Sequence, residues 1–199
     1  MVVLDDGKGT GVSAEVNSVN QLRIRSTTHT EEHWVSESVG DTYAASVGAT
    51  GIDSLTFLTT ESGDVFQLTN NSTTNMVVSL IAITASAPGG ILTLVKNKIQ
   101  GTLTQNTQVT PTNLNFGSAK IANATVNVWD ETNGNGIQGL SGGIVFRTII
   151  TPSTFFANTA GTLVLPQGTS LTINYNNITG STIEFECGVR FYYDTETTQ

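Results

Sequence analysis

The stretch TIEFECGVRFYYD, Thr182 to Asp194, alternates apolar and polar side chains almost without a break. One side of an extended chain would carry Ile183, Phe185, Cys187, Val189 and Phe191. Successive side chains of a β-strand point to opposite faces, so this period of two predicts a strand with one face in an apolar core. Cys187 is accordingly expected to be a small buried residue and not a nucleophile.

Shorter strand-like runs separated by turn residues precede this stretch, from Thr42 onward. MVVSLIAITAS (76–86) is apolar enough to be buried on both faces. We expect two hairpins, one around ESGD (61–64) and one around PQG (166–168), and a loop over TPSTFFANTAG (151–161). A polar connection is expected over 104–118. With no sustained helical period, the pattern predicts an all-β fold, a β-sandwich or jelly-roll-like domain.

Residues 1–40 differ from the rest of the chain. They contain small glycine-rich steps and polar segments in which only Leu22 and Ile24 alternate convincingly. We therefore predict an extended N-terminal arm over 1–40, which needs a neighbouring protein to order it, and a sandwich domain over 41–199.

Composition narrows the functional classes. Charged residues make up only 12% of the chain, and 8 Lys+Arg face 16 Asp+Glu, for a net charge of -8. That balance repels polyanions, so we expect no nucleic-acid partner. The longest apolar stretch is strand-sized, which predicts no membrane span. One cysteine allows no intrachain disulfide. The N-terminus lacks the pattern of an export signal, which predicts synthesis in a cytoplasm without export by that route.

The segment HTEEH (29–33) matches the H-x-x-E-H pattern of one class of zinc peptidases. Such a site needs both imidazoles on one face of a long helix, and the flanking β-branched and Ser residues are poor helix formers. In an extended chain His29 and His33 would lie about 13 Å apart, too far to share a metal. Thr28-x-x-Glu31 is compatible with one capped helical turn. We predict a surface or interface role for both histidines and no metal site.

Other candidates for chemistry are weaker. DETNGNG (130–136) lacks the final Glu of a calcium loop, and GKGTG (7–11) lacks the Lys-Ser/Thr pair of a phosphate loop. We predict no catalytic residue and no cofactor. The Asn-x-Ser/Thr sequons at Asn70, Asn71, Asn123 and Asn177 are interpreted as a by-product of the 33 Thr and 17 Asn. Five aromatic side chains are expected to pack in the core or an interface more often than to stack on a sugar, namely Trp34, Trp129, Tyr175, Tyr192 and Tyr193.

Several short motifs carry a family resemblance. The arm contains a V-N-x-x-N-x-L step at 16–22, followed by polar Thr/Glu-rich segments. Later motifs are LTNNS (68–72), NLNFGSAK (113–120), LPQGTSLTINY (165–175) and the closing RFYYD (190–194). Together they resemble small structural proteins of tailed bacteriophages.

The resemblance implies a virion component. The leading expectation is a capsid decoration, or cement, protein on the outer surface of the phage head. Its partners would be the major capsid protein and copies of itself, grouped as a homotrimer or quasi-threefold cluster. The arm would attach by strand addition and apolar anchors. The predicted partner-binding residues are Val16, Asn17, Asn20, Leu22, Ile24, Arg25 and Trp34.

Two other functions remain open at this point. One is a tail or fibre component that binds a host glycan through exposed aromatics and Asn or Asp side chains in loops such as 129–141 or 152–161. The other is a bacterial carbohydrate-binding or adhesive module, against which the missing export pattern counts. An enzyme is the least favoured.

Overall fold

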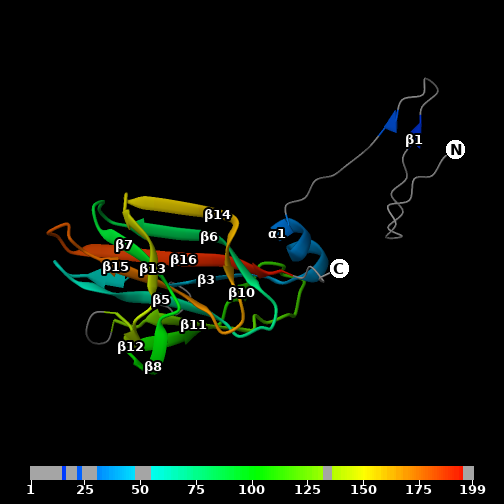
Figure 1. Cartoon of the computed structure of the whole chain (residues 1–199). Helices are drawn as coiled ribbons and strands as arrows, with labels where there is room; N and C mark the ends of the chain where they lie inside the picture. The colour runs from blue at the N-terminus through cyan, green and yellow to red at the C-terminus, as the bar shows by residue number, and fades with distance from the viewer. Residues whose placement is uncertain (1–14, 17–21, 24–30, 48–54, 132–135, 195–199) are drawn as a thin grey trace. The chain divides into compact units, whose positions relative to one another are not determined.

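The computed structural model describes residues 15–16, 22–23, 31–47, 55–131 and 136–194 (Figure 1). The chain divides into two compact units, Met1–Thr30 and Glu31–Gln199. In the first unit, β1 (Glu15–Val16) pairs antiparallel with β2 (Leu22–Arg23), and Val16 lies opposite Leu22 in register. Two-stranded ribbons this short are marginal on their own in water.

The second unit opens with a short helix, α1 (Glu31–Trp34), which continues into a π-helical turn, η1 (Val35–Val39). No helix in the described ranges is long and apolar enough to span a membrane. The rest of the unit is built from strands. In chain order they are β3 (Thr42–Ser46), β4 (Leu55–Phe57), β5 (Ser62–Asn70), β6 (Met76–Ala85), β7 (Ile91–Lys96), β8 (Ile99–Thr104), β9 (Asn106–Val109), β10 (Thr112–Asn113), β11 (Ala124–Trp129), β12 (Gln138–Ser141), β13 (Ile144–Ile150), β14 (Thr154–Leu165), β15 (Ser170–Asn176) and β16 (Ile183–Tyr193).

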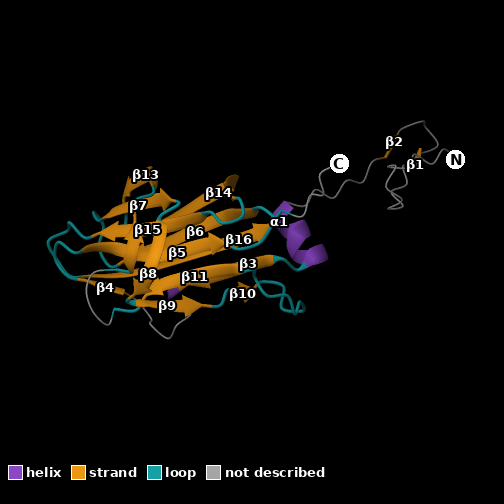
Figure 2. Ribbon diagram, turned by 60° about the horizontal axis from the view of Figure 1, so that its bottom comes forward, coloured by secondary structure: helices purple, strands orange, loops and turns teal. Residues whose placement is uncertain are grey.

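Most of these strands form two six-stranded antiparallel sheets with one apolar core between them (Figure 2). Sheet I has the order β10-β3-β16-β6-β14, with β4 also paired to β16. Sheet II has the order β13-β7-β15-β5-β11-β9. Strands β8 and β12 pair separately as a two-stranded ribbon.

The chain passes back and forth between the sheets. Strands β3, β6, β14 and β16 belong to sheet I, and β5, β7, β13 and β15 belong to sheet II. The order β3-β16-β6-β14 therefore faces β5-β15-β7-β13, which is the eight-strand, double-sheet arrangement of a jelly roll. The predicted all-β sandwich is confirmed, and β4, β9, β10 and β11 are additions to the eight-strand frame.

The alternating stretch 182–194 lies near the centre of sheet I. It forms β16, which pairs with both β3 and β6. The five predicted inward residues, from Ile183 to Phe191, are at most 3% exposed. Strand β6 is buried without interruption over Met76–Ser79 and alternates beyond that point. Aromatic rings fill the core between the sheets, with the Tyr175 ring centroid 4.3 Å from that of Phe185 and 4.9 Å from that of Phe57.

Both predicted hairpins are wrong. Strand β4 pairs with β16 in sheet I, whereas β5 pairs with β11 and β15 in sheet II. Likewise β14 pairs with β6, and β15 pairs with β5 and β7. Each turn thus carries the chain from one sheet to the other. Turn chemistry is local and is the same in a hairpin and in a sheet-to-sheet crossing, so the sequence could not separate the two.

The predicted loop over 151–161 is also wrong, because most of it lies in strand β14. Among the residues that the structure describes, this strand pairs with β6 alone, and its register shifts between Asn158 and Leu163. An edge strand with an irregularity shows no clean period of two, which is why the pattern was missed. The polar connection over 104–118 likewise contains two short strands, β9 and β10.

Residues 31–39, which we assigned to the arm, form α1 and η1 and belong to the second unit. Val35 and Val39 lie four positions apart, on one side of the helical segment, and pack with Val77 and Tyr192. Val35 is 1% exposed. Burial of Val35, with Val39 partly buried beside it, stabilises the helical form of this segment, which its polar sequence did not reveal.

Candidate attachment site

The helical segment is held to sheet I by a carboxylate as well as by valines. Glu32 Oε1 lies 2.7 Å from Arg190 Nε and accepts a hydrogen bond from Ser79 Oγ at 3.0 Å. Ser79 and Arg190 belong to the neighbouring strands β6 and β16, so one side chain ties α1 to two strands. Glu32 is the glutamate of the H-x-x-E-H pattern, and here it makes structural contacts.

The two histidines of that motif are not shown together. His33 lies in α1, with Nε2 3.3 Å from Glu37 Oε2, and His29 lies outside the described residues. Within the described ranges, no three His, Cys, Asp or Glu side chains are grouped so as to hold a metal ion.

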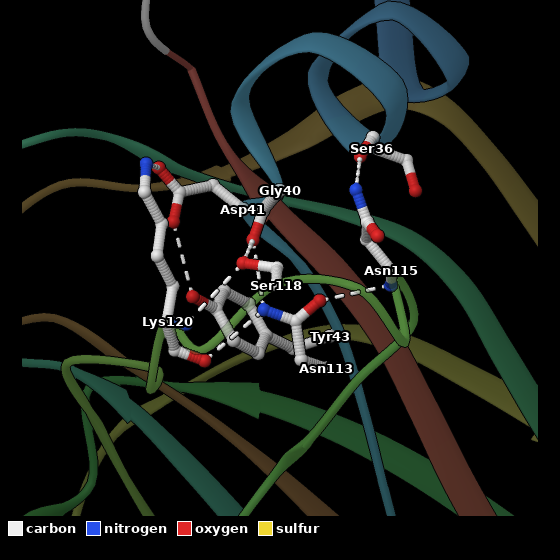
Figure 3. A network of polar contacts seen from close by, with 8 residues as sticks. All are labelled: Ser36, Gly40, Asp41, Tyr43, Asn113, Asn115, Ser118 and Lys120. Carbon is white, nitrogen blue, oxygen red and sulfur yellow. Dashed lines mark hydrogen bonds and ion pairs between the residues drawn. The ribbon is translucent and has the colours of Figure 1, made fainter.

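A second set of contacts, which we call the base clamp, holds the end of η1 to the loop between β10 and β11 (Figure 3). Asn113 Nδ2 donates to the carbonyl oxygens of Gly40, at 2.8 Å, and of Lys120, at 3.1 Å. Asn115 Nδ2 donates to the Ser36 carbonyl at 2.7 Å, and Ser118 Oγ donates to the Gly40 carbonyl at 3.3 Å. The clamp therefore satisfies carbonyls at the end of η1, which would otherwise have no helical partner.

Gly40 is the pivot of the clamp. It has a left-handed φ of 70° and donates its N–H to the Val35 carbonyl at 2.8 Å, which closes η1. A Cβ at this position would lie 2.6 Å from Ser118 Oγ. Glycine is thus required both by the backbone angle and by the close approach of the loop.

Two contacts of the Asp41 carboxylate extend the base clamp to β3. Lys120 Nζ lies 2.8 Å from Asp41 Oδ2, and Tyr43 OH donates to Asp41 Oδ1 at 3.0 Å. Burial, together with the hydrogen bond to Asp41, raises the pKa of Tyr43 well above its ordinary value of 10.0. The root of the helical segment is consequently joined to the sandwich on both sides of Gly40.

The clamp loop also displays apolar side chains outward. Phe116 is 89% exposed, although it lies between Asn115 and Ser118, and Ile121, just beyond Lys120, is 77% exposed. Trp34, in α1, is 50% exposed. Large apolar groups held outward on hydrogen-bonded elements are suited to docking against another protein.

Of the predicted partner-binding residues, the structure places three. Val16 and Leu22 are register partners in β1 and β2, and Trp34 lies in α1 of the second unit. Asn17, Asn20, Ile24 and Arg25 lie outside the described residues. The clamp was missed as a site. Its signal was present in NLNFGSAK, where short hydrogen-bonding side chains surround a phenylalanine that no strand pattern explains.

The aromatics considered for sugar stacking are mostly internal. Trp129, Tyr175, Tyr192 and Tyr193 are at most 6% exposed, which leaves Trp34 as the exposed member of the set. Cys187 is 3% exposed, and its burial raises the thiol pKa. In the 152–161 segment considered for glycan binding, Phe156 is 67% exposed.

Comparison with protein-family models, curated proteins and solved structures gives no match for this chain.

Proposed function

We propose that this protein is a structural component of a tailed-phage particle, a decoration protein that binds the major capsid protein lattice on the outer surface of the head. The observation that carries the proposal is the fixed root of the N-terminal unit. Residues 31–40, which join that unit to the sandwich, are held by the Glu32–Arg190 pair, by buried Val35 and by the base clamp.

A fixed root matters because a cement protein has to transmit force. If the arm engages one capsid subunit and the sandwich rests on another, a flexible joint between them would let the two subunits separate. The hydrogen bonds and the ion pair of residues 31–40 would give the arm a fixed point of departure on the sandwich, so that less chain could extend under load. Many copies acting together then stabilise the shell even if each contact is weak.

The arm itself suits attachment by strand addition. The β1–β2 pair is two residues long on each strand, and so short a ribbon could be stabilised by pairing with a sheet edge of a neighbouring protein. Leu22 and Ile24 would then be apolar anchors of the arm, and Trp34, Phe116 and Ile121 would pack against the capsid from the sandwich unit. The net charge of -8 is compatible with an outer position, away from packaged nucleic acid.

The experiment is immunogold labelling of particles released from cells that make this protein, combined with matched variants of the full chain. Leu22→Asp introduces a charge into the arm, and Ile178→Asp makes the same change at a body position that is 53% exposed. The proposal expects label on the head, a large loss of incorporated copies for Leu22→Asp, and normal incorporation for Ile178→Asp. Label confined to the tail would favour the fibre alternative, and unlabelled particles would refute a virion role.

A further inference from the structure

One side of the sandwich has two open sheet edges. In the part of the chain that the structure describes, β13 pairs only with β7 and β14 pairs only with β6. The two strands lie on the same side of the molecule, because Arg147 of β13 sits over the Phe155 ring of β14, 6.0 Å from its centroid. Both edges therefore offer unpaired backbone groups to a partner at the same place.

Large apolar side chains are concentrated on these two strands. We call them the edge patch, and each is between 43% and 73% exposed. The edge patch consists of Ile144, Val145, Phe146, Ile150, Phe156 and Val164. Proteins that remain monomeric usually protect a sheet edge with charged residues, and β13 carries one, Arg147, whose guanidinium lies over Phe155.

A groove of about 280 Å³ lies between parts of the two edges, and its lining also includes Lys96 and Asn97 at the end of β7 and residues 169–171 around the start of β15. Phe146, at the register shift of β13, forms one part of its wall, and Leu163, Val164 and Leu165 of β14 form another. The groove is large enough for one or two apolar side chains of a docking partner. The bulge at Phe146 thus places a concave groove beside a strand edge whose other apolar side chains protrude.

The distribution of charge points to the occupant. The 52 residues from 132 to 183, which include β13 and β14, contain one charged residue, Arg147, in a chain whose net charge is -8. Strands β13 and β14 contain no carboxylate, so two copies that approach through these strands would not bring like negative charges of the strands together. The rest of the chain carries all 16 acidic residues and the 7 other basic ones, and this excess of negative charge makes the approach of two identical surfaces unfavourable there.

The exposed apolar area of the edge patch is also sufficient for a stable protein–protein interface. The six side chains of the edge patch expose on the order of 600 Å², and a standard interface buries roughly 800 Å² per partner, somewhat more than half of it apolar. We propose that the edge patch is a self-association surface on which a second copy of this chain docks, with apolar side chains of one copy entering the groove between β13 and β14 of the other.

The test uses the full chain and charge-matched variants. Val145→Lys and Ile150→Lys place a cation in the edge patch at positions that are 57% and 73% exposed, so neither disturbs the core. Ile99→Lys makes the same change on β8, at a position that is 69% exposed. Sedimentation velocity from about 1 to about 100 µM gives the self-association constant of each protein. Far-ultraviolet circular dichroism and a thermal melt verify that each variant is folded.

The proposal expects a wild-type oligomer within this range and an association constant at least about tenfold lower for Val145→Lys and Ile150→Lys, with Ile99→Lys unchanged. A wild-type chain that is monomeric throughout would overturn it. So would edge variants that associate as the wild type does. Edge variants that associate normally yet fail to enter particles would assign the patch to the capsid instead. Self-association in solution is independent of particle binding, so the two proposals can fail separately.

Discussion

Replacing Asn113 by alanine should weaken the protein specifically at the base clamp. Its side chain donates to two carbonyls, of Gly40 and Lys120, and Oδ1 accepts the Asn115 N–H at 2.9 Å. A hydrogen bond of this kind contributes about 1 kcal/mol net, and partial exposure of the loop lowers the sum, so we expect a loss of about 2 kcal/mol in the free energy of unfolding.

Two companion variants sharpen this prediction. Asn113→Asp keeps the acceptor for Asn115 but turns an oxygen toward the Gly40 and Lys120 carbonyls, so it should cost at least as much as alanine. Asn71→Ala removes one exposed hydrogen bond, from Nδ2 to Thr125 Oγ1 at 2.8 Å, and should change stability by less than about 0.5 kcal/mol.

Urea unfolding followed by circular dichroism measures the free energies, provided that the transition is two-state. Amide hydrogen exchange then locates the effect, since the Gly40 N–H bonded to Val35 should lose protection before the core strands do. If Asn113→Ala matched Asn71→Ala in stability, or if the Gly40 amide kept its protection, the clamp would not fix the root of the helical segment.

Two further predictions concern the core and the clamp tyrosine. Gly90→Ala should lower the free energy of unfolding by about 1–3 kcal/mol, because the new Cβ would lie 2.6 Å from Tyr175 Cε2 and that ring is packed against Phe57 and Phe185. Urea unfolding at neutral pH tests this, and an unchanged midpoint would contradict it. Because the pKa of Tyr43 is raised in the folded protein, this phenol ionises at lower pH in the unfolded chain, so the free energy of unfolding should fall as pH rises through about 10. Tyr43→Phe should be less stable than the wild type at pH 8 but should lose about 1 kcal/mol less stability between pH 9 and 11. Parallel pH profiles of the two proteins would argue against this.

The strands that could be predicted from the sequence are those with one face toward the core and the other toward solvent. Strand β16 lies between β3 and β6, so its inward side chains meet the core along its whole length and its outward ones do not. This contrast produces an unbroken period of two. Strand β14 has one neighbour and a register shift, and Phe155 and Phe156 follow each other on opposite faces. Its sequence therefore resembles that of a loop.

Pairing partners could not be predicted for a different reason. Turns such as the one at Pro166–Gly168 are specified by local hydrogen bonds, and the sheet that receives the next strand is decided by core packing. The sequons illustrate the same local chemistry. Asn177 is fully buried, donates to the carbonyls of Phe57, Leu58 and Ser181, and accepts from Thr179 N–H. The Asn177-x-Thr179 spacing therefore serves to build a turn, a role that the Asn- and Thr-rich composition of the chain did not reveal.

Of the candidate attachment site, only the arm was predicted from the sequence. Leu22 and Ile24 could be singled out because they alternate in a polar segment. The base clamp joins Ser36 and Gly40 to residues 113–120, more than 70 positions away, and such a contact leaves no periodic signal. Glu32 is similar, since its partners Ser79 and Arg190 are brought together by the pairing of β6 with β16.

The most direct test of the attachment proposal compares the full chain with residues 31–199 alone. Phage heads prepared without this protein are mixed with either form, and the temperature at which the heads disrupt is measured. If the arm on its fixed root is the attachment element, the full chain will bind and raise that temperature, while residues 31–199 will stay folded but neither bind nor protect. Equal protection by both forms, or binding of neither, would contradict the account.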